Sequence, residues 1–542
     1  MNIALAQLNY TIGDFSGNST KIIETINKAR TEGASLIVFS ELAVCGYPPD
    51  DLLDYPHFIE KCKETLHKIT EHTQNITAIV GCPIANNNAK GRKLYNAACV
   101  LQNGQLIKTI HKTLLPTYDV FDESRYFQSN DVFEIIDING IKTAITICED
   151  LWDEMDEFSY LTDPLKNLNA LNPALLINIS ASPYNLGKRN TRMHILQNQC
   201  QGFNLPLIYV NQVGAHTDLI FDGNSVVLNG KGETVLQLPD FEECIAYYNT
   251  EKQYTPITVA DDDKIETLHQ ALVFSIKDYF NKMGFTKAIL GSSGGIDSAL
   301  VQTLASKALG AQNVTAILMP SQFSSDGSVT DALQLSKNLG NPYQIIPIKN
   351  IFNSYEETLK PLFKDLPFNV AEENLQARSR AILLMAYSNK FGDILLNTSN
   401  KSEMSVGYTT LYGDMCGSLS VIGDVYKTDV YALCKLINKE NEIIPNSIIY
   451  KAPSAELRPN QKDSDSLPEY DILDAILKQY IEGKKSKVDI IAQGFENEVV
   501  EHVINMVNRN EYKRFQAPPI LRITSKSFGR GRVMPLVAIW KY

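Results

Sequence analysis

The 542-residue chain contains no hydrophobic run that approaches the about 18 apolar residues of a membrane-spanning helix. Residues 1–8 lack a basic start and a long apolar core, so they do not match a signal peptide. The nine cysteines include no C-x-x-C pair, and an odd number of them is typical of free thiols in a reducing compartment. These absences predict a cytoplasmic protein that makes no contact with a membrane.

Basic residues are outnumbered, because 50 lysines and arginines stand against 62 aspartates and glutamates, for a net charge of −12. A general nucleic-acid binder would present a basic face, so we expect no nucleic-acid partner. The negative net charge does not exclude a local basic pocket for a phosphorylated ligand. The eight histidines show no H-E-x-x-H spacing, which argues against structural zinc. Ordinary hydrophobic content, 44%, and this length predict a globular protein of several domains, at about 150 residues each.

One stretch of small residues stands between a predicted strand, 287–290, and a predicted helix, 299–310. Backbone N–H groups converge at such a helix start, and its dipole favours an anion there. Glycines let a phosphate approach the backbone closely, serine hydroxyls add donors, and an aspartate can hold magnesium beside the phosphates. We therefore predict an ATP-binding loop made of Gly291, Ser292, Ser293, Gly294, Gly295, Ile296, Asp297 and Ser298.

This loop lacks the lysine of a P-loop and instead resembles the pyrophosphate loop of the ATP pyrophosphatases. That group adenylates a substrate and releases pyrophosphate, and it includes NAD synthetase, GMP synthetase, asparagine synthetase and some tRNA-modifying enzymes. The resemblance implies the nucleotide chemistry and leaves the acceptor open. For two glycines alone, a plain turn between strand and helix would be the better interpretation.

The first half of the chain alternates short apolar runs with amphipathic segments such as 20–29. This alternation predicts a layered α/β domain of roughly 250 residues. The predicted strands are 1–8, 34–39, 78–81, 97–101, 143–147, 174–179, 207–211 and 225–228.

Three reactive side chains, Glu41, Lys112 and Cys148, each follow a strand-like run in this half. A cysteine at a helix start has its thiolate favoured by the dipole, a nearby lysine can stabilise an oxyanion, and a carboxylate can act as general base. Taken singly, each has an ordinary alternative, because buried cysteines usually pack a core and charged residues at strand ends are usually solvated.

The surrounding strings at 38–42, 111–116 and 147–150 resemble the carbon–nitrogen hydrolase (nitrilase) superfamily, whose triad is Glu-Lys-Cys. The resemblance covers 1–249 and implies an α-β-β-α sandwich in which Glu41, Lys112 and Cys148 meet and hydrolyse an amide. It also implies a second catalytic glutamate, Glu123. In the glutaminase branch, the positions that hold glutamine correspond to Tyr118, Ser182 and Lys188.

The pattern loosens at 250–263, which we interpret as a linker, and a predicted helix at 265–283 follows. The remaining segment, 264–542, alternates strands and helices, which predicts a doubly wound parallel sheet with ligands at the carboxyl ends of its strands. Its predicted elements are the strands 287–290, 314–320, 343–348 and 394–397 and the helix 372–390.

Strings at 373–378, 397–403, 423–430, 453–459 and 513–519 resemble the glutamine-dependent NAD synthetase family. The resemblance extends over essentially the whole chain and implies contact of Thr398 with ATP. It implies that Asn374, Glu403, Lys427 and Lys513 bind nicotinic acid adenine dinucleotide (deamido-NAD), with Lys427 at a phosphate and Asp297 and Glu403 at magnesium. The polar segment 453–468 is either a loop that closes over substrate or a disordered connector.

The implied reaction uses ATP as co-substrate and Mg²⁺ to adenylate deamido-NAD, and ammonia from glutamine then yields NAD. Most free ammonia would be protonated in water at neutral pH and would no longer be a nucleophile, so we hypothesise an enclosed ammonia path between the two sites. The family resemblance implies a homo-oligomer, at least a dimer, with an octamer as the larger alternative. The alternative function is amidation of another acceptor. Asparagine synthetase places a cysteine after the initiator methionine where this chain has Asn2, and GMP synthetase uses a Cys-His-Glu glutaminase. A nucleotide-sensing module would leave Glu41, Lys112 and Cys148 without a role.

Overall fold

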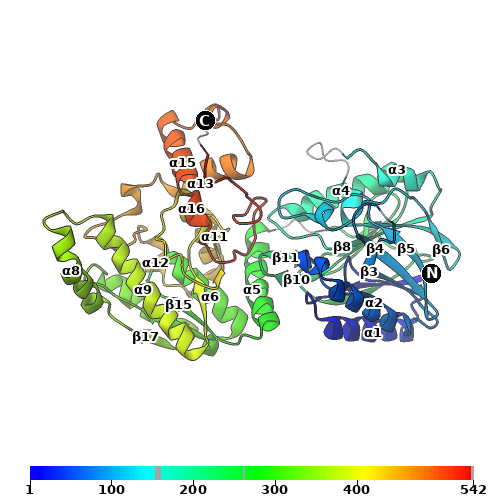
Figure 1. The fold of residues 1–542 in the computed structure, drawn as a ribbon, viewed down its shortest axis with the longest axis horizontal. Helices are drawn as coiled ribbons and strands as arrows, with labels where there is room; N and C mark the ends of the chain where they lie inside the picture. The colour runs from blue at the N-terminus through cyan, green and yellow to red at the C-terminus, as the bar shows by residue number, and fades with distance from the viewer. Residues whose placement is uncertain (89, 153–159, 260–262, 539–542) are drawn as a thin grey trace. The chain divides into compact units, whose positions relative to one another are not determined.

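The computed structural model describes residues 1–542 except 89, 153–159, 260–262 and 539–542. The chain divides into two units, 1–262 and 263–542, and the boundary lies at the end of the segment predicted as a linker (Figure 1). Among the described helices, none is both long enough and apolar enough to cross a membrane.

The first unit contains two six-stranded mixed sheets. In spatial order, the first sheet consists of β14 (Cys244–Asn249), β1 (Asn2–Gln7), β2 (Leu36–Val38), β3 (Thr77–Ala85), β4 (Leu94–Gln102) and β5 (Gln105–His111). The second consists of β13 (Thr234–Gln237), β12 (Val226–Leu228), β9 (Leu207–Asn211), β8 (Leu175–Ser180), β7 (Ile141–Ile147) and β6 (Ile136–Ile138). A separate hairpin is formed by β10 (Val213–His216) and β11 (Leu219–Asp222).

Alternation along the strands builds four layers, because successive side chains point to opposite faces of a sheet. Ile3 and Leu5 of β1 join the core between the two sheets, whereas Ala4 and Ala6 join a second core with helix residues such as Ile22. The second sheet packs its other face on helices in the same way. The covering helices are α1 (Phe15–Thr31) and α2 (Pro56–Thr70) on the first sheet, and α3 (Pro164–Asn169) and α4 (Lys188–Phe203) on the second.

The second unit is built on five parallel strands. Their order is β17 (Tyr343–Ile345), β16 (Val314–Leu318), β15 (Ala288–Gly291), β18 (Ile394–Asn397) and β19 (Leu419–Ser420). The chain moves outward from β15 to β17 and then returns to add β18 on the opposite side of β15. This reversal makes the crevice between β15 and β18 the topological switch point, where open α/β sheets bind ligands.

The helices of the second unit include a group around the sheet and a group after it that has its own apolar core. The first group is α5 (Lys264–Met283), α6 (Ile296–Leu309), α7 (Asp326–Leu339), α8 (Lys349–Phe363), α9 (Val370–Phe391), α10 (Lys401–Val406), α11 (Lys427–Ile437) and α12 (Asn446–Tyr450). The later group is α13 (Tyr470–Leu477), α14 (Lys487–Ile491), α15 (Asn497–Arg509) and α16 (Glu511–Arg514).

The predicted fold class is confirmed in both halves, and the predicted strands and helices are present with shifted ends. The predicted strand 343–348 is shorter, because only Tyr343–Ile345 pairs with β16 and the strand lies at the sheet edge. The segment 453–468 is described, with a short 3₁₀ turn at Asp463–Asp465, and it lines the cavity of this unit. The interpretation of this segment as a disordered connector is therefore wrong.

Gly81 on β3 lies against the turn that follows β2. A Cβ atom at this position would lie 2.3 Å from the backbone nitrogen of Leu42 and 2.4 Å from the carbonyl oxygen of Ser40. Real Cβ atoms do not approach backbone this closely, so only glycine lets the turn that carries Glu41 pack against β3.

We expect Gly81→Ala to lower the free energy of unfolding by about 1–3 kcal/mol, because the added methyl group forces the backbone apart. Gly202→Ala is the matched control, since among the described residues no atom beyond the neighbouring backbone of α4 lies within 4 Å of its added Cβ, and alanine favours a helix. Thermal unfolding of both variants measures the difference, and equal stability of the two would contradict this packing account.

Candidate active sites

Glu41, Lys112 and Cys148 are placed by three different strands of the first unit. Glu41 follows β2, Lys112 directly follows β5, and Cys148 directly follows β7 and opens the 3₁₀ turn Cys148–Leu151. The strands β2 and β5 belong to one sheet and β7 to the other, so the group lies where the ends of the two sheets meet.

A buried ammonium group links two carboxylates at this place. Lys112 is fully buried, and its Nζ lies 2.8 Å from Oε1 of Glu41 and 2.8 Å from Oε1 of Glu123. Burial opposes the charge of Lys112, but Glu123 and Glu41 outweigh this effect and hold its pKa well above the ordinary value. Burial also raises the pKa of Glu123, and Lys112 partly offsets that increase.

The carboxylate of Glu41 is fixed by two further donors. Asn96 Nδ2 donates to Oε1 at 2.7 Å, and the backbone N–H of Ala181 donates to Oε2 at 2.9 Å. The Cys148 thiol is buried, and burial together with the Glu41 carboxylate raises its pKa. The resting thiol is therefore protonated near neutral pH, next to a carboxylate that can accept its proton.

Two of the three residues expected to hold glutamine, Tyr118 and Lys188, lie near Glu149, which the sequence analysis did not single out. Tyr118 donates its hydroxyl to Oε1 of Glu149 at 2.9 Å, and Tyr160 does the same at 2.9 Å. Lys188 lies over the Trp152 ring, 5.1 Å from its centroid, and contributes to the field at Glu149. Ser182 is buried directly after Ala181. The adjacency of Glu149 to Cys148 was the available sequence signal.

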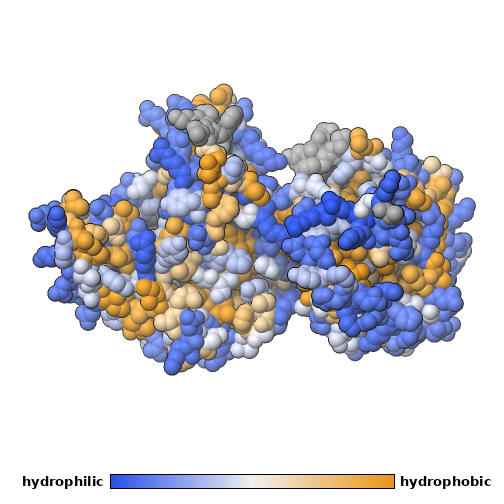
Figure 2. Space-filling model, in the orientation of Figure 1, coloured by the Kyte–Doolittle hydropathy of each residue, from blue (hydrophilic) through white to orange (hydrophobic). Residues whose placement is uncertain are grey.

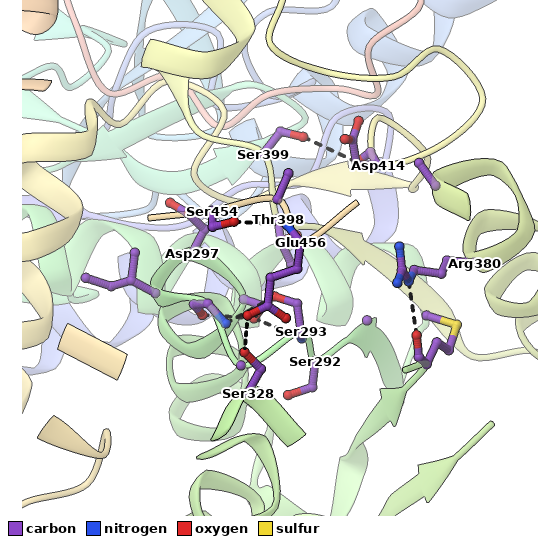
Figure 3. A pocket seen from close by; sticks show the side chains of 18 of the residues that line it. Ser292, Ser293, Asp297, Ser328, Arg380, Thr398, Ser399, Asp414, Ser454 and Glu456 are labelled. Atoms are coloured by element: carbon purple, nitrogen blue, oxygen red, sulfur yellow. Dashed lines mark hydrogen bonds between the residues drawn. The ribbon is translucent and has the colours of Figure 1, made fainter. Parts of the chain in front are cut away.

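The second unit has a cavity of about 300 Å³ at the switch point of its sheet (Figure 3). The whole stretch 291–298 lines it, together with Thr398, which follows β18, and with Glu403 and Lys427. The structure thus brings these sequence-predicted residues to one cavity.

Within the loop 291–298, serine hydroxyls hydrogen-bond to each other and to the loop backbone. Ser293 Oγ and Ser298 Oγ are 3.0 Å apart, and the N–H of Gly295 donates to Ser293 Oγ at 3.2 Å. Gly294 has φ +77°, and a Cβ there would lie 2.2 Å from the carbonyl oxygen of Ser328. Helix α6 begins at Ile296 without a side-chain cap, so its first N–H groups can receive an anion.

A second buried lysine links carboxylates beside this loop. Lys427 Nζ lies 2.5 Å from Oδ2 of Asp297 and 2.9 Å from Oε1 of Glu403. Asn400 Nδ2 donates to the other oxygen of Asp297 at 2.9 Å. Burial lowers the pKa of Lys427, but Asp297 and Glu403 outweigh it and raise the pKa, while burial raises the pKa of Asp297.

Asn374 and Lys513 lie outside the cavity lining and contact the segment 407–410. Thr410 donates its hydroxyl to Asn374 Oδ1 at 2.7 Å, and Lys513 Nζ donates to the carbonyl oxygens of Gly407 and Thr409 at 2.7 and 2.8 Å. Because Tyr408 and Thr409 line the cavity, these two residues support its wall.

Sequence reasoning missed several cavity residues, among them Arg380, Asp414 and Glu456. Arg380 lies on α9 and donates to the carbonyl oxygen of Met319 at 3.1 Å, and it stands apart from Glu456 and the loop serines in Figure 3. The sequence signal available for Arg380 was its place, at helical spacing, on the same face as the apolar residues Ala377, Ala381 and Leu384. Burial raises the pKa of Asp414 to about 7. Glu456 accepts from Ser328 Oγ at 2.7 Å, a contact 128 residues apart that no local pattern indicates.

Comparison with known proteins finds a matching family for each of the two units. The family model described as carbon–nitrogen hydrolase matches residues 2–255, and the model described as NAD synthase matches 268–517. The glutamine-dependent NAD(+) synthetase of Synechocystis sp. is 48% identical, over 98% of this chain and 98% of its own. The chain belongs to the glutamine-dependent NAD(+) synthetase family.

Other members of the glutamine-dependent NAD(+) synthetase family match the chain over nearly its full length. The relative from Acinetobacter baylyi is 43% identical over 99% of this chain and 98% of its own. A solved synthetase of this family from Acinetobacter baumannii, in complex with ADP, is 41% identical, with a TM-score of 0.79, over 100% of this chain and 99% of its own. The resemblance found in the sequence is thereby confirmed.

Proposed function

We propose that the chain hydrolyses glutamine to glutamate and ammonia in its first unit and makes NAD from deamido-NAD, ATP and that ammonia in its second. The observation that carries the proposal is the presence on one chain of a cysteine beside a buried Glu–Lys pair and of a glycine-serine loop beside a buried lysine that pairs with two partly buried carboxylates. We also propose a cytoplasmic location, because all nine cysteines are free thiols.

In the glutaminase step, the Cys148 sulfur attacks the amide carbon while Glu41 accepts the thiol proton. The Lys112 ammonium and backbone N–H groups stabilise the negative charge that develops on the amide oxygen. Glu41 returns the proton to the departing nitrogen, ammonia leaves, and water then hydrolyses the thioester with Glu41 as base. The bonds from Asn96 and Ala181 hold the Glu41 oxygens in place for these transfers.

Charged side chains of the first unit match the two charged groups on the α-carbon of glutamine. The Glu149 carboxylate suits the α-ammonium group of glutamine, and the Lys188 ammonium suits its α-carboxylate, while Tyr118 orients Glu149. Ser182 directly follows Ala181, whose N–H binds Glu41, and would add a further polar contact to glutamine. An amide with neither α-group would therefore lose two charged contacts and bind more weakly.

In the synthetase step, loop 291–298 and the start of α6 bind the ATP phosphates, with Thr398 beside them. The deamido-NAD carboxylate attacks the α-phosphorus, pyrophosphate leaves, and ammonia displaces AMP from the acyl-adenylate. Lys427 neutralises phosphate charge, Glu403 faces the dinucleotide, and Asn374 and Lys513 support the wall at 407–410.

The carboxylates of Asp297 and Glu403 fit a magnesium ion, which takes one or two carboxylates together with substrate phosphates. Both side chains line the cavity, and each contacts Lys427, so they would hold the ion together with the ATP phosphates and not by themselves. Mg²⁺ would neutralise phosphate charge during adenylation.

Substitutions in the two sites should remove different activities. We expect Cys148→Ala to abolish glutamine-dependent NAD formation while high ammonium still supports it, because the synthetase unit is unchanged. We expect Asp297→Ala to reduce NAD formation to the background with either nitrogen source, with glutamine hydrolysis persisting. NAD and glutamate assays on both variants measure this. Glutamine-dependent synthesis by the first variant would show that Cys148 is not the nucleophile. Normal ammonium-dependent synthesis by the second would show that Asp297 does not act in the synthetase site.

We further propose a homo-oligomer, at least a dimer, with an octamer as the larger alternative. Exposed apolar side chains gather at one edge of the second unit, on β17 and around α8 and α9 (Figure 2). We define this apolar patch as Tyr343, Ile345, Leu362, Leu366, Phe368, Val370, Ile382 and Phe391. A second copy of the chain, presenting the same patch, is its proposed partner, since a two-fold interface buries identical surfaces against each other.

We expect the purified protein to have a mass in solution of at least two 60.5 kDa chains. The double variant Leu366→Glu/Ile382→Glu should shift the mass toward one chain or a smaller assembly, because charges at an apolar interface are costly. Val488→Glu, at an exposed apolar residue outside the patch, is the control. A monomeric native protein, or an unchanged assembly in the double variant, would refute this interface.

A further inference from the structure

Asp150 is buried two residues after Cys148, and the proposed mechanism gives it no task. Its Oδ1 accepts the backbone N–H groups of Thr113 and Leu114 at 3.0 and 2.8 Å, and its Oδ2 accepts the N–H of Ile147 at 3.0 Å. One carboxylate therefore binds the residue directly after Lys112 and the residue directly before Cys148.

These bonds connect parts of the site that no strand pairing connects. Lys112 follows β5 in one sheet, and Cys148 follows β7 in the other. Covalent continuity between them runs through more than thirty residues of loop and strand, so the chain alone does not fix their separation. The three bonds of Asp150 fix it through backbone atoms on both sides.

The backbone at the nucleophile also needs support. Cys148 has φ +42°, in the left-handed region that residues other than glycine rarely adopt. Such a conformation persists only where surrounding contacts hold it. The bond from Ile147 N–H to Asp150 closes the turn around Cys148 on one side, and Asn178 Nδ2 approaches the Cys148 carbonyl oxygen at 3.5 Å on the other.

We propose that Asp150 is a positioning residue of the glutaminase site, which sets the placement of the Cys148 sulfur relative to the Lys112 ammonium by binding both backbones. Its charge is suited to this task, because a carboxylate accepts all three N–H groups at once. Asparagine has one oxygen and one NH₂ group in place of the two carboxylate oxygens. Its NH₂ group would therefore face either the N–H groups of Thr113 and Leu114 or the N–H group of Ile147, and two donors cannot bond to each other.

The inference rests on the proposed function, and the two can fail separately. The wild-type protein is first assayed for glutamine hydrolysis: no hydrolysis would overturn the proposed function itself. Asp150→Asn and Asp150→Glu are then compared with wild type. Asp137→Asn is the matched control, because this exposed aspartate of the same unit accepts a single turn N–H, that of Gly140.

For Asp150→Asn we expect kcat for glutamine hydrolysis to fall about 100-fold, the loss that follows when reacting groups are misplaced by about 1 Å. KM should change little, because Asp150 does not face the substrate. Calorimetric binding of glutamine to Cys148→Ala and to Cys148→Ala/Asp150→Asn should give similar affinities. Ammonium-dependent NAD formation and the Asp137→Asn control should match wild type.

Hydrogen exchange gives a readout of the contacts themselves. The amides of Thr113, Leu114 and Ile147 should lose protection in Asp150→Asn, while those elsewhere in β7 and β5 keep it. A kcat within about twofold of wild type, or a raised KM with kcat unchanged, would overturn the proposal. Thermal unfolding of both Asp150 variants far below wild type would also overturn it, because Asp150 would then support the fold of the unit rather than the geometry of the site.

Discussion

Two carboxylates that share a pocket repel each other unless a cation lies between them, and both candidate sites meet this constraint with a lysine. Lys112 lies between Glu41 and Glu123, and Lys427 lies between Asp297 and Glu403. Each lysine is raised in pKa by its two partners. Burial of such charges costs free energy, so their retention indicates that geometry and charge at these points serve chemistry.

The surroundings of the two lysines explain their different tasks. Lys112 has no exposed side-chain surface, and its carboxylate partner Glu41 is held by backbone and side-chain donors from both sheets. This rigidity suits repeated proton transfers at one sulfur. Lys427 faces a cavity of about 300 Å³ that also holds an anion loop, so phosphates and a cation can enter beside it. This openness suits a site that assembles around its substrates.

Local patterns in the sequence predicted what depends on neighbours in the chain. Strand alternation, the glycine-serine loop and the residues at strand ends predicted layered α/β units, the ATP loop and the reactive residues Glu41, Lys112 and Cys148. The α-β-β-α sandwich and the remaining candidate residues came from the family resemblance. The local patterns did not indicate that Lys427 bonds to Asp297, a contact 130 residues apart, or that Asp150 binds the backbone after Lys112. Glu456 was missed for the same reason, because its contact with Ser328 joins distant segments. Glu149 and Arg380 were missed although each had a local signal, next to Cys148 and on α9. The assignment of Asn374 and Lys513 to the dinucleotide stays a prediction, because both residues contact the segment 407–410 behind the cavity and do not line the cavity themselves.

The central claim is that the two lysine-centred sites carry out one coupled reaction, in which the nitrogen released at Cys148 is the nitrogen that enters NAD. The most direct measurement supplies glutamine labelled with ¹⁵N in its amide group, a pool of unlabelled ammonium, ATP and deamido-NAD, and follows the label in NAD by mass spectrometry. The account predicts NAD that carries nearly the full label, with glutamate and NAD formed in equal amounts. Label diluted to the level of the ammonium pool, with glutamate formed in excess, would contradict it.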